Sequence, residues 1–450
     1  MFTRLSQGYG AKAVILAVLV VCAYPSVSRG QAVAPDELLT LSRAIELALR
    51  NQPSILAGIG AVRAGEARIG EAKSSYYPQF SAAGAYSKIS RPSSSAAVTS
   101  AGTGGTGTAV VSSTSGVFDQ YTGSVGVNQL LWDFGKTAST VRVQDYNTQS
   151  SRYDLRSTQD QVIFNVKQTY YNLLLAIRTR DVAQESVNNF EKHLQQARGF
   201  FEVGTKPKFD VTKAEVDLSN ARLSLIKAEN QVRLARVNLN NAMGTPEAPE
   251  YTLEDALFFV SYDLPFDAAL QKAFAQRADL QSLTQKKNSS KESISLAQKG
   301  YYPALNATAS YYYTGTEFPL SDGWNYGFNV TAPIFNGFLT KYQVAEAKAN
   351  YDTASATERS LRLSIISQVQ QGYVLLRQAN ESIVASDVAV RQAKENVDLA
   401  LGRYQAGVGS PIEVTDALTA LSNAEVAYVS ALTDYKNAQA SIEVAIGARD

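Results

Sequence analysis

Hydrophobic residues recur at spacings of three and four along two very long stretches of this chain, one in each half of the sequence. In the first stretch, Val162, Val166 and Tyr170 follow this spacing, which is typical of one face of an α-helix. Residues 136–201 contain no proline, and their first glycine is Gly199. A helix of about 65 residues is about 100 Å long, because each residue adds 1.5 Å. No compact domain contains such an element, so the pattern predicts long helices packed as coiled-coil hairpins.

Shorter segments alternate between apolar and polar residues, which predicts β-strands. The clearest lies at 305–313, where Leu305, Ala307, Ala309, Tyr311 and Tyr313 share one face. A second alternating segment follows at 325–332, and a weaker pair surrounds Phe80 and Val125 in the first half. We therefore expect four strands of about ten residues, two in each half.

The two halves are copies of one another. The segment FEVGTKPKFDVTKAEVDLSNAR at 201–222 returns as YQAGVGSPIEVTDALTALSNAE at 404–425, with an offset of 203. Segments before the strands instead match at an offset of 225, as in LSRAIELALRNQPSI and FDAALQKAFAQRADL. LLWDFGK then matches PIFNGFL at an offset of 202, so the first copy contains an insertion of 225 − 202 = 23 residues. Its Ser/Thr/Gly-rich composition predicts an exposed loop at 90–117.

The duplication predicts the following organisation. Residues 1–30 form a signal peptide and 31–250 a first repeat, with helices at 41–76, a β-hairpin at 78–134 and a helical hairpin at 136–244. Residues 245–264 form an equatorial linker. A second repeat covers 265–450, with helices at 265–300, a β-hairpin at 303–335 and a helical hairpin at 338–447.

The N-terminal segment resembles a secretory leader. Arg4 and Lys12 precede a short apolar run at 13–23, followed by small and turn-forming residues. Cys22, the single cysteine, could accept a lipid, but Val21 before it does not suit that modification. Without the leader, 39 basic and 41 acidic residues give a net charge of −2 and no cysteine remains. These features argue against nucleic-acid binding, disulfides and thiolate chemistry.

Four strands cannot close a barrel alone, because about eight is the practical minimum. Oligomerisation around a symmetry axis would remove their open edges. Aromatic residues gather at the predicted strand ends and suit an interfacial girdle, the candidates being Tyr77, Trp132, Tyr302 and Trp324. The alternative is that these aromatics pack a soluble sheet.

At this point the chain resembles the TolC-type outer-membrane efflux proteins. The resemblance rests on LTLSRAIELALRNQPSI, a YYP before each first strand, LLWDFGK, the two turns and RADL, in the family's order. It implies an α+β membrane protein, a homotrimer in outer-membrane lipid with a twelve-stranded barrel continued by a periplasmic α-helical barrel. It also implies the exit duct of a tripartite efflux or type I secretion system, with a periplasmic adaptor and an inner-membrane pump of the RND, ABC or MFS class. No enzymatic activity, cofactor or metal is expected, and the cargo stays open.

The second turn contains candidate pore residues. Glu413 and Asp416 are three apart and share a helix face, so three copies would place six carboxylates around a pore, a cation-selecting arrangement. The alternative is a capping box formed by Ser410 and Glu413 after a proline start. The resemblance favours a role for both acids at the periplasmic entrance.

Other positions of the turns receive roles only from the resemblance. Tyr404 and Asp210 match positions that link neighbouring hairpins when the channel is closed, and Gly204 and Gly407 match the tips that contact the adaptor. Gly409 stands where the best-known member has an arginine, so part of that link is missing.

The remaining motifs are weak. GTGGTG at 102–107 lacks the strand and helix that a dinucleotide-binding loop requires. His193, the single histidine, lies among polar residues and is expected on a solvated helix face. A coiled-coil surface protein without a channel, an exported enzyme and a simple porin are the rival interpretations.

Overall fold

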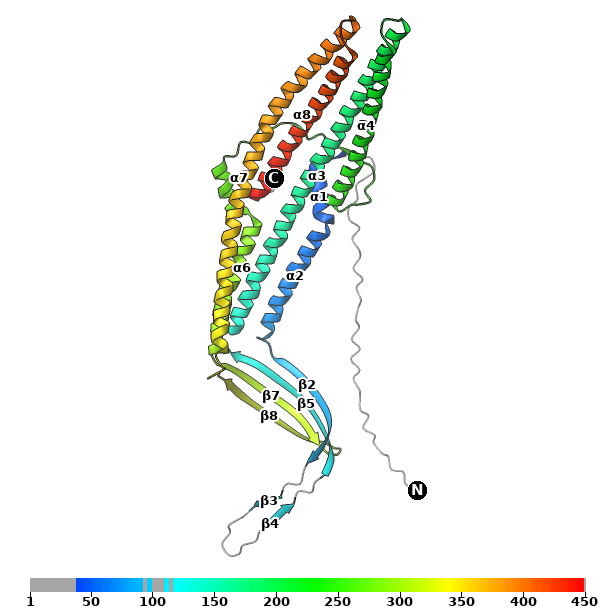
Figure 1. Ribbon diagram of the computed structural model, residues 1–450. Helices are drawn as coiled ribbons and strands as arrows, with labels where there is room; N and C mark the ends of the chain where they lie inside the picture. The colour runs from blue at the N-terminus through cyan, green and yellow to red at the C-terminus, as the bar shows by residue number, and fades with distance from the viewer. Residues whose placement is uncertain (1–37, 92–94, 99–108, 113–115, 449–450) are drawn as a thin grey trace, which may run out of the picture.

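The computed structural model of the chain describes residues 38–91, 95–98, 109–112 and 116–448 (Figure 1). The predicted signal peptide, Cys22 and the GTGGTG motif lie outside the described residues.

Four long helices dominate the molecule (Figure 1). Helices α3 (Lys136–Glu202) and α7 (Leu339–Gln405) have 67 residues each. Helices α4 (Lys208–Met243) and α8 (Pro411–Ile446) return from the turns and have 36 residues each. A 67-residue helix is about 100 Å long, so the predicted long helices are confirmed. Within the described residues, no helix combines the length and the hydropathy needed to cross a membrane.

Shorter helices flank the long ones in matching pairs. In the first half these are α1 (Leu41–Asn51) and α2 (Pro53–Ser74). In the second half they are α5 (Phe266–Gln276) and α6 (Ala278–Gln298), followed by the 3-10 turn η1 (Lys299–Tyr301). Both α2 and α6 pack against α3, and α6 also packs against α7. Near the sheet, the helical part of the molecule therefore contains four helices, α2, α3, α6 and α7.

The sheet lies at one end of the helices (Figure 1). Its strands β2 (Gln79–Arg91), β5 (Gly116–Trp132), β7 (Ala304–Gly315) and β8 (Ser321–Thr331) are antiparallel, in the order β2-β5-β7-β8. The expectation of a loop throughout 90–117 is wrong in part. Strand β2 continues to Arg91, and β3 (Ser95–Val98) pairs with β4 (Ala109–Ser112). The segments SAAV and AVVS contain neither proline nor glycine, and they pair beyond the β2–β5 hairpin, which already sets the register.

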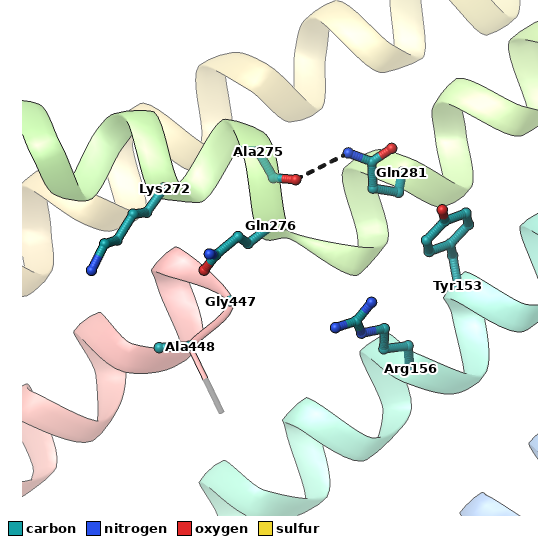
Figure 2. A pocket seen from close by; sticks show the side chains of 8 residues that line it. All are labelled: Tyr153, Arg156, Lys272, Ala275, Gln276, Gln281, Gly447 and Ala448. Atoms are coloured by element: carbon teal, nitrogen blue, oxygen red, sulfur yellow. Dashed lines mark hydrogen bonds between the residues drawn. The ribbon is translucent and has the colours of Figure 1, made fainter. Parts of the chain in front are cut away.

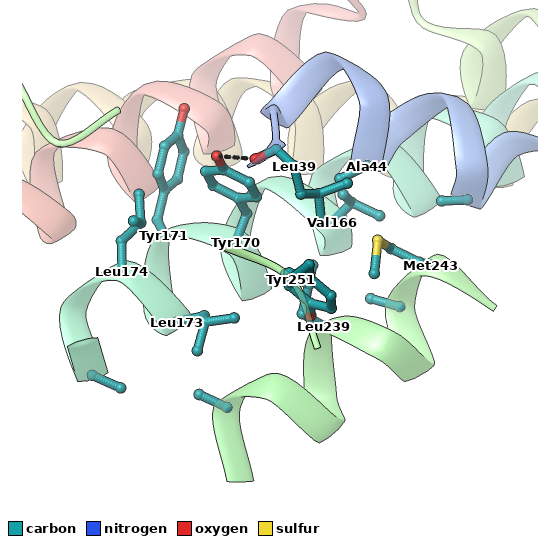
Figure 3. Packing of buried hydrophobic residues seen from close by; sticks show 14 of the residues in the cluster. Leu39, Ala44, Val166, Tyr170, Tyr171, Leu173, Leu174, Leu239, Met243 and Tyr251 are labelled. Carbon is teal, nitrogen blue, oxygen red and sulfur yellow. Dashed lines mark hydrogen bonds between the residues drawn. The ribbon is translucent and has the colours of Figure 1, made fainter. Parts of the chain in front are cut away.

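Two equivalent hydrophobic cores lie where the short helices meet the long ones. The first joins α1, α3 and α4 to the linker after α4 (Figure 3). Its largest fully buried member, Tyr170, donates its hydroxyl proton to the backbone carbonyls of Leu39 (3.0 Å) and Glu254 (2.8 Å). These bonds fix the point where β1 (Leu38–Leu39) pairs in parallel with β6 (Thr252–Leu253) of the linker. The second core surrounds Ile365 and Ile442.

Glycines with a left-handed backbone mark equivalent points of the two copies. Gly204 and Gly407, one in each turn, have φ of +76° and +79°. Gly244 and Gly447 end α4 and α8 with φ of +70° and +71°. Residues with a Cβ resist this conformation, so glycine at these positions allows the two helical hairpins to turn and end in the same way.

Candidate functional site

The second turn joins α7 to α8 and contains the candidate acids. Ser410 begins α8 as its N-cap and accepts a hydrogen bond from the amide of Ile412 (3.2 Å), while Pro411 occupies the first helical position. The capping box named as the alternative does not form, because the side chain of Ser410 accepts from Ile412 rather than from the amide of Glu413. Its carboxylate instead accepts a hydrogen bond from Nε of Arg403 at 3.1 Å.

The first turn has the same backbone shape but different capping. Helix α3 ends at Glu202, and the amides of Thr205 and Lys206 donate to the carbonyl of Phe200 (2.9 and 3.3 Å). Pro207 is the N-cap of α4, where the second copy has Ser410. The two turns are therefore equivalent in path and distinct in the side chains that they present.

A set of polar residues connects the two hairpins just behind the turns. The hydroxyl of Tyr404 donates to Asp210 at 3.4 Å, and the hydroxyl of Thr415 donates to Asp217 at 2.8 Å. Nζ of Lys206 lies 3.4 Å from the carbonyl oxygen of Gly409 and 5.0 Å from the centre of the Tyr404 ring. We call this set the inter-hairpin latch; its residues are Lys206, Asp210, Asp217, Tyr404, Gly409 and Thr415.

Most residues of the latch are buried. Tyr404 is fully buried, and Asp210 and Asp217 are 4% and 7% exposed. Burial, together with the charge of Asp210, raises the pKa of Tyr404 to about 12. Asp217 also forms an ion pair of 2.5 Å with Lys213, one turn earlier on α4. Beneath these groups, apolar residues of α3, α4, α7 and α8 form a third core that joins both hairpins.

The four predicted gate residues thus separate into two groups. Tyr404 and Asp210 meet in the buried latch, and their role in a closed state stays a prediction. Glu413 and Asp416 lie on the exposed side of α8, and Asp416 makes no hydrogen bond or ion pair with another described residue. The predicted tip glycines, Gly204 and Gly407, are at the turns themselves, and a Cβ at either position would meet open space.

Sequence reasoning missed three contributors to the latch. Lys206, Asp217 and Thr415 all lie inside the duplicated turn segments, but only Thr415 matches an identical residue in the other copy. The available signal was that the two turn segments share a glycine at the same position but differ in their polar side chains. Lys206 also changes the interpretation of Gly409, because it brings a cation from the first turn to the second.

His193 does not lie on a solvated face as expected; it is 1% exposed. The second hairpin covers it, and its ring lies 5.2 Å from the ring of Tyr404. Local helical pattern cannot reveal this burial, since the residues that cover it come from the other half of the chain.

The sheet presents two chemically different faces. One row across all four strands is Phe80, Val127, Ala309 and Tyr326. The row one residue further along, on the opposite face, is Ser81, Gly126, Ser310 and Asn325. Phe80 and Tyr326 are 77% and 75% exposed in the isolated chain. Such exposure of large apolar side chains indicates a face that is covered by something other than water.

The candidate girdle residues lie at both ends of this sheet. Tyr77, Trp132 and Tyr302 are at the end nearest the helices, where Phe134 stacks on Tyr302 at 5.2 Å. Trp324 is paired with Tyr311 toward the other end, and it stacks on its neighbour Tyr326. All four candidates are more than half exposed.

A pocket of about 570 Å³ lies far from the turns, where α5 and α8 end beside α3 (Figure 2). Arg156 and Lys272 contribute positive charge to its lining, which contains no carboxylate among the described residues. Two helix C-termini meet at this pocket, and their carbonyl groups carry partial negative charge that such cations stabilise. Among the described residues of this lining, no nucleophile is paired with a base.

Known proteins resemble the chain over almost all of the described residues. The family described as "Outer membrane efflux protein" matches residues 44–245 and 269–448. The outer membrane protein TolC of Escherichia coli K12 is 26% identical over 342 residues, covering 72% of this chain and 69% of that protein. The probable efflux pump outer membrane protein TtgC of Pseudomonas putida KT2440 is 25% identical over 350 residues, covering 74% and 70%.

Solved structures show the same fold at lower identity. A crystal structure of CusC superimposes with a TM-score of 0.78 and 17% identity, covering 93% of this chain and 95% of that one. The CmeC outer membrane channel of Campylobacter jejuni gives 0.74 and 20%, covering 90% and 85%. The resemblance stated from the sequence and the α+β class with long helices are therefore confirmed. This chain belongs to the outer membrane efflux protein family.

Proposed function

We propose that the chain is the outer-membrane exit duct of a tripartite efflux system. One observation carries this proposal: a sheet with one apolar face and one polar face continues directly into helices about 100 Å long. A twelve-residue strand such as β7 is about 40 Å long and spans about 30 Å when tilted by about 40°. That span matches the hydrocarbon core of a bilayer. The apolar face would then contact lipid and the polar face would line the lumen.

The proposed assembly is a homotrimer. Strands β2 and β8 are the edges of the sheet, with no further described strand beside them. Three copies of a four-stranded sheet give a closed barrel of twelve strands, which removes these edges.

The helices support the same assembly. Helices α4 and α7 lie at the two lateral edges of the protomer (Figure 1). Each exposes large apolar side chains, as Leu223 and Val237 do on α4 and Leu363 and Val374 do on α7. In the proposed trimer, α4 of one copy packs against α7 of the next, and the long helices form a periplasmic barrel.

We further propose that the turns form the periplasmic entrance. Asp416, exposed and unpaired among the described residues, is the main pore acid. Glu413 is partly neutralised by Arg403 and contributes less. The tips around Gly204 and Gly407 would meet the hairpins of a periplasmic adaptor, which connects the duct to an inner-membrane pump of the RND, ABC or MFS class.

Planar-bilayer recording of the purified trimer tests the pore assignment. Asp416→Ala should reduce cation selectivity and weaken block by divalent cations. Asp352→Ala removes another exposed carboxylate, near the sheet end of α7, and serves as the matched control. If Asp416→Ala leaves both properties unchanged, the pore assignment is wrong. If no variant and no wild-type preparation conducts, the channel proposal itself is wrong.

Gene deletion distinguishes efflux from protein secretion. Loss of an efflux duct should increase susceptibility to small toxic compounds, whereas loss of a type I secretion duct should remove specific proteins from the medium. A deletion strain with neither change would contradict both functions. A plasmid carrying the wild-type gene should restore the phenotype.

A further inference from the structure

The buried histidine of α3 has two ring nitrogens that find no hydrogen-bond partner in the described part of the chain. His193 is 1% exposed, and neither Nδ1 nor Nε2 has a hydrogen-bond partner among the described residues. Polar atoms buried in this way are rare, because losing water without gaining a partner costs free energy. The cost indicates a position with a task beyond packing.

The position of His193 places it between the two hairpins rather than within one. Its ring contacts the ring of Tyr404 on α7 at a centroid distance of 5.2 Å and an interplanar angle of 61°. Phe200 contacts the same tyrosine at 5.6 Å. His193 therefore packs against the tyrosine ring whose hydroxyl donates to Asp210.

Charged groups face His193 from the neighbouring elements. Helix α4 contributes Asp210, Lys213 and Asp217, and α7 contributes the phenol of Tyr404. One of these carboxylates, Asp217, also accepts a hydrogen bond from the hydroxyl of Thr415 on α8. Burial lowers the pKa of His193, Lys213 lowers it further, and the two carboxylates oppose these effects.

Both carboxylates already accept hydrogen bonds from other groups. Asp217 accepts from Lys213 and Thr415, and Asp210 accepts from Tyr404. A proton on His193 would thus create a buried cation whose nearby acids are engaged elsewhere. An imidazolium has two donors that both require partners or water.

We propose that His193 is a proton sensor of the inter-hairpin latch: the neutral ring lets the hairpins pack, and the protonated ring favours their separation. This inference rests on the proposed gate. It assigns a regulatory input to that gate, namely the acidity of the compartment around the turns.

The sign of the effect follows from linkage. A buried histidine with a lowered pKa holds fewer protons when the hairpins are packed than when they are apart. The packed state of the two hairpins therefore keeps its full stability above the ordinary pKa of 6.5 and loses stability as the pH falls below it. At pH 5.5 an exposed imidazole is protonated about ten to one, so the open population can rise by up to about 10-fold per protomer. Exposed carboxylates stay ionised in this range.

The first experiment compares bilayer conductance at pH 7.5 and pH 5.5. Wild type should open more at pH 5.5, and His193→Gln, which keeps a polar side chain without the titration, should show no such change. Asp416→Asn should retain the response, which separates the histidine from the pore acid. The proposal is overturned if His193→Gln keeps the wild-type pH profile, or if acid closes the wild-type channel.

The second experiment does not depend on conduction or on a variant that folds. Because His193 is the single histidine of the chain, its imidazole signals in a histidine-labelled full-length sample are unambiguous. The signal should titrate with a midpoint below 6.5. A midpoint at or above 6.5 overturns the proposal. A low midpoint in a protein that never conducts would instead contradict the proposed duct while leaving His193 as a buried titrating group.

Discussion

Gly409 offers a sharp test of how the second turn is built. A Cβ at this position would lie 2.8 Å from the amide nitrogen of Tyr404 and 2.9 Å from the carbonyl carbon of Arg403. Both are backbone atoms, so neither can rotate away. The amide of Gly409 also donates to the carbonyl of Arg403 at 2.9 Å, and its own carbonyl faces Lys206. Gly409→Ala must therefore move the turn and weaken the latch.

The size of the effect can be worked out from the contacts. Overpacking of this kind destabilises a structure by about 1–3 kcal/mol. Because the added Cβ would make two contacts below 3.0 Å with backbone atoms, we expect a cost of about 2 kcal/mol. Such a change raises the population of the opened turn by about 30-fold, since about 1.4 kcal/mol is a factor of ten. Gly402→Ala is the matched control, because nothing lies within 4 Å of its Cβ and it sits inside α7. That change should stabilise the helix by about 0.5–1 kcal/mol.

Hydrogen exchange followed by mass spectrometry measures both variants on peptides covering residues 400–415. Gly409→Ala should accelerate exchange there by about 10- to 100-fold, and Gly402→Ala should slow it slightly. Exchange in the sheet should not change in either variant. Wild-type rates in Gly409→Ala would refute the close packing described for this turn.

Two further substitutions test contacts between elements. Tyr404→Phe removes the donor to Asp210 and should weaken the latch by about 1–2 kcal/mol. Bilayer recording at constant pH should then show a higher open probability. Unchanged gating would show that the 3.4 Å contact contributes nothing. Lys167→Met breaks a largely buried pair with Glu443 (2.6 Å) between α3 and α8, and should lower the free energy of unfolding by about 2 kcal/mol. Adding Glu443→Gln should recover part of that loss, and strictly additive losses in denaturant unfolding would contradict a direct interaction.

Sequence reasoning found the elements that depend on residue patterns repeated every few positions along the chain. A three-four spacing maintained from Val162 to Tyr170 and beyond identifies α3, and an alternating segment such as 305–313 identifies β7. Matching glycines located both turns, because a left-handed residue is needed wherever such a turn occurs. These features depend on neighbours a few residues away, so one sequence is sufficient to find them.

The parts that sequence reasoning missed depend on distant residues. Glu413 follows Ser410 at capping-box spacing, yet Arg403 from the preceding helix takes its carboxylate. His193 has polar neighbours along the chain, yet α7 covers it with Tyr404. In both cases the competing partner is brought close by a turn or by the second hairpin, and periodicity along one helix does not report it.

The equal lengths of the paired helices have a mechanical consequence. Because α3 and α7 both have 67 residues and α4 and α8 both have 36, the two hairpins extend equally far from the sheet. A seven-residue insertion shared by α3 and α4 alone would raise one tip by about 10 Å. The polar contacts behind the turns would then face the wrong partners, although each hairpin remained intact. Length changes in this protein should therefore be tolerated only when all four long helices change together.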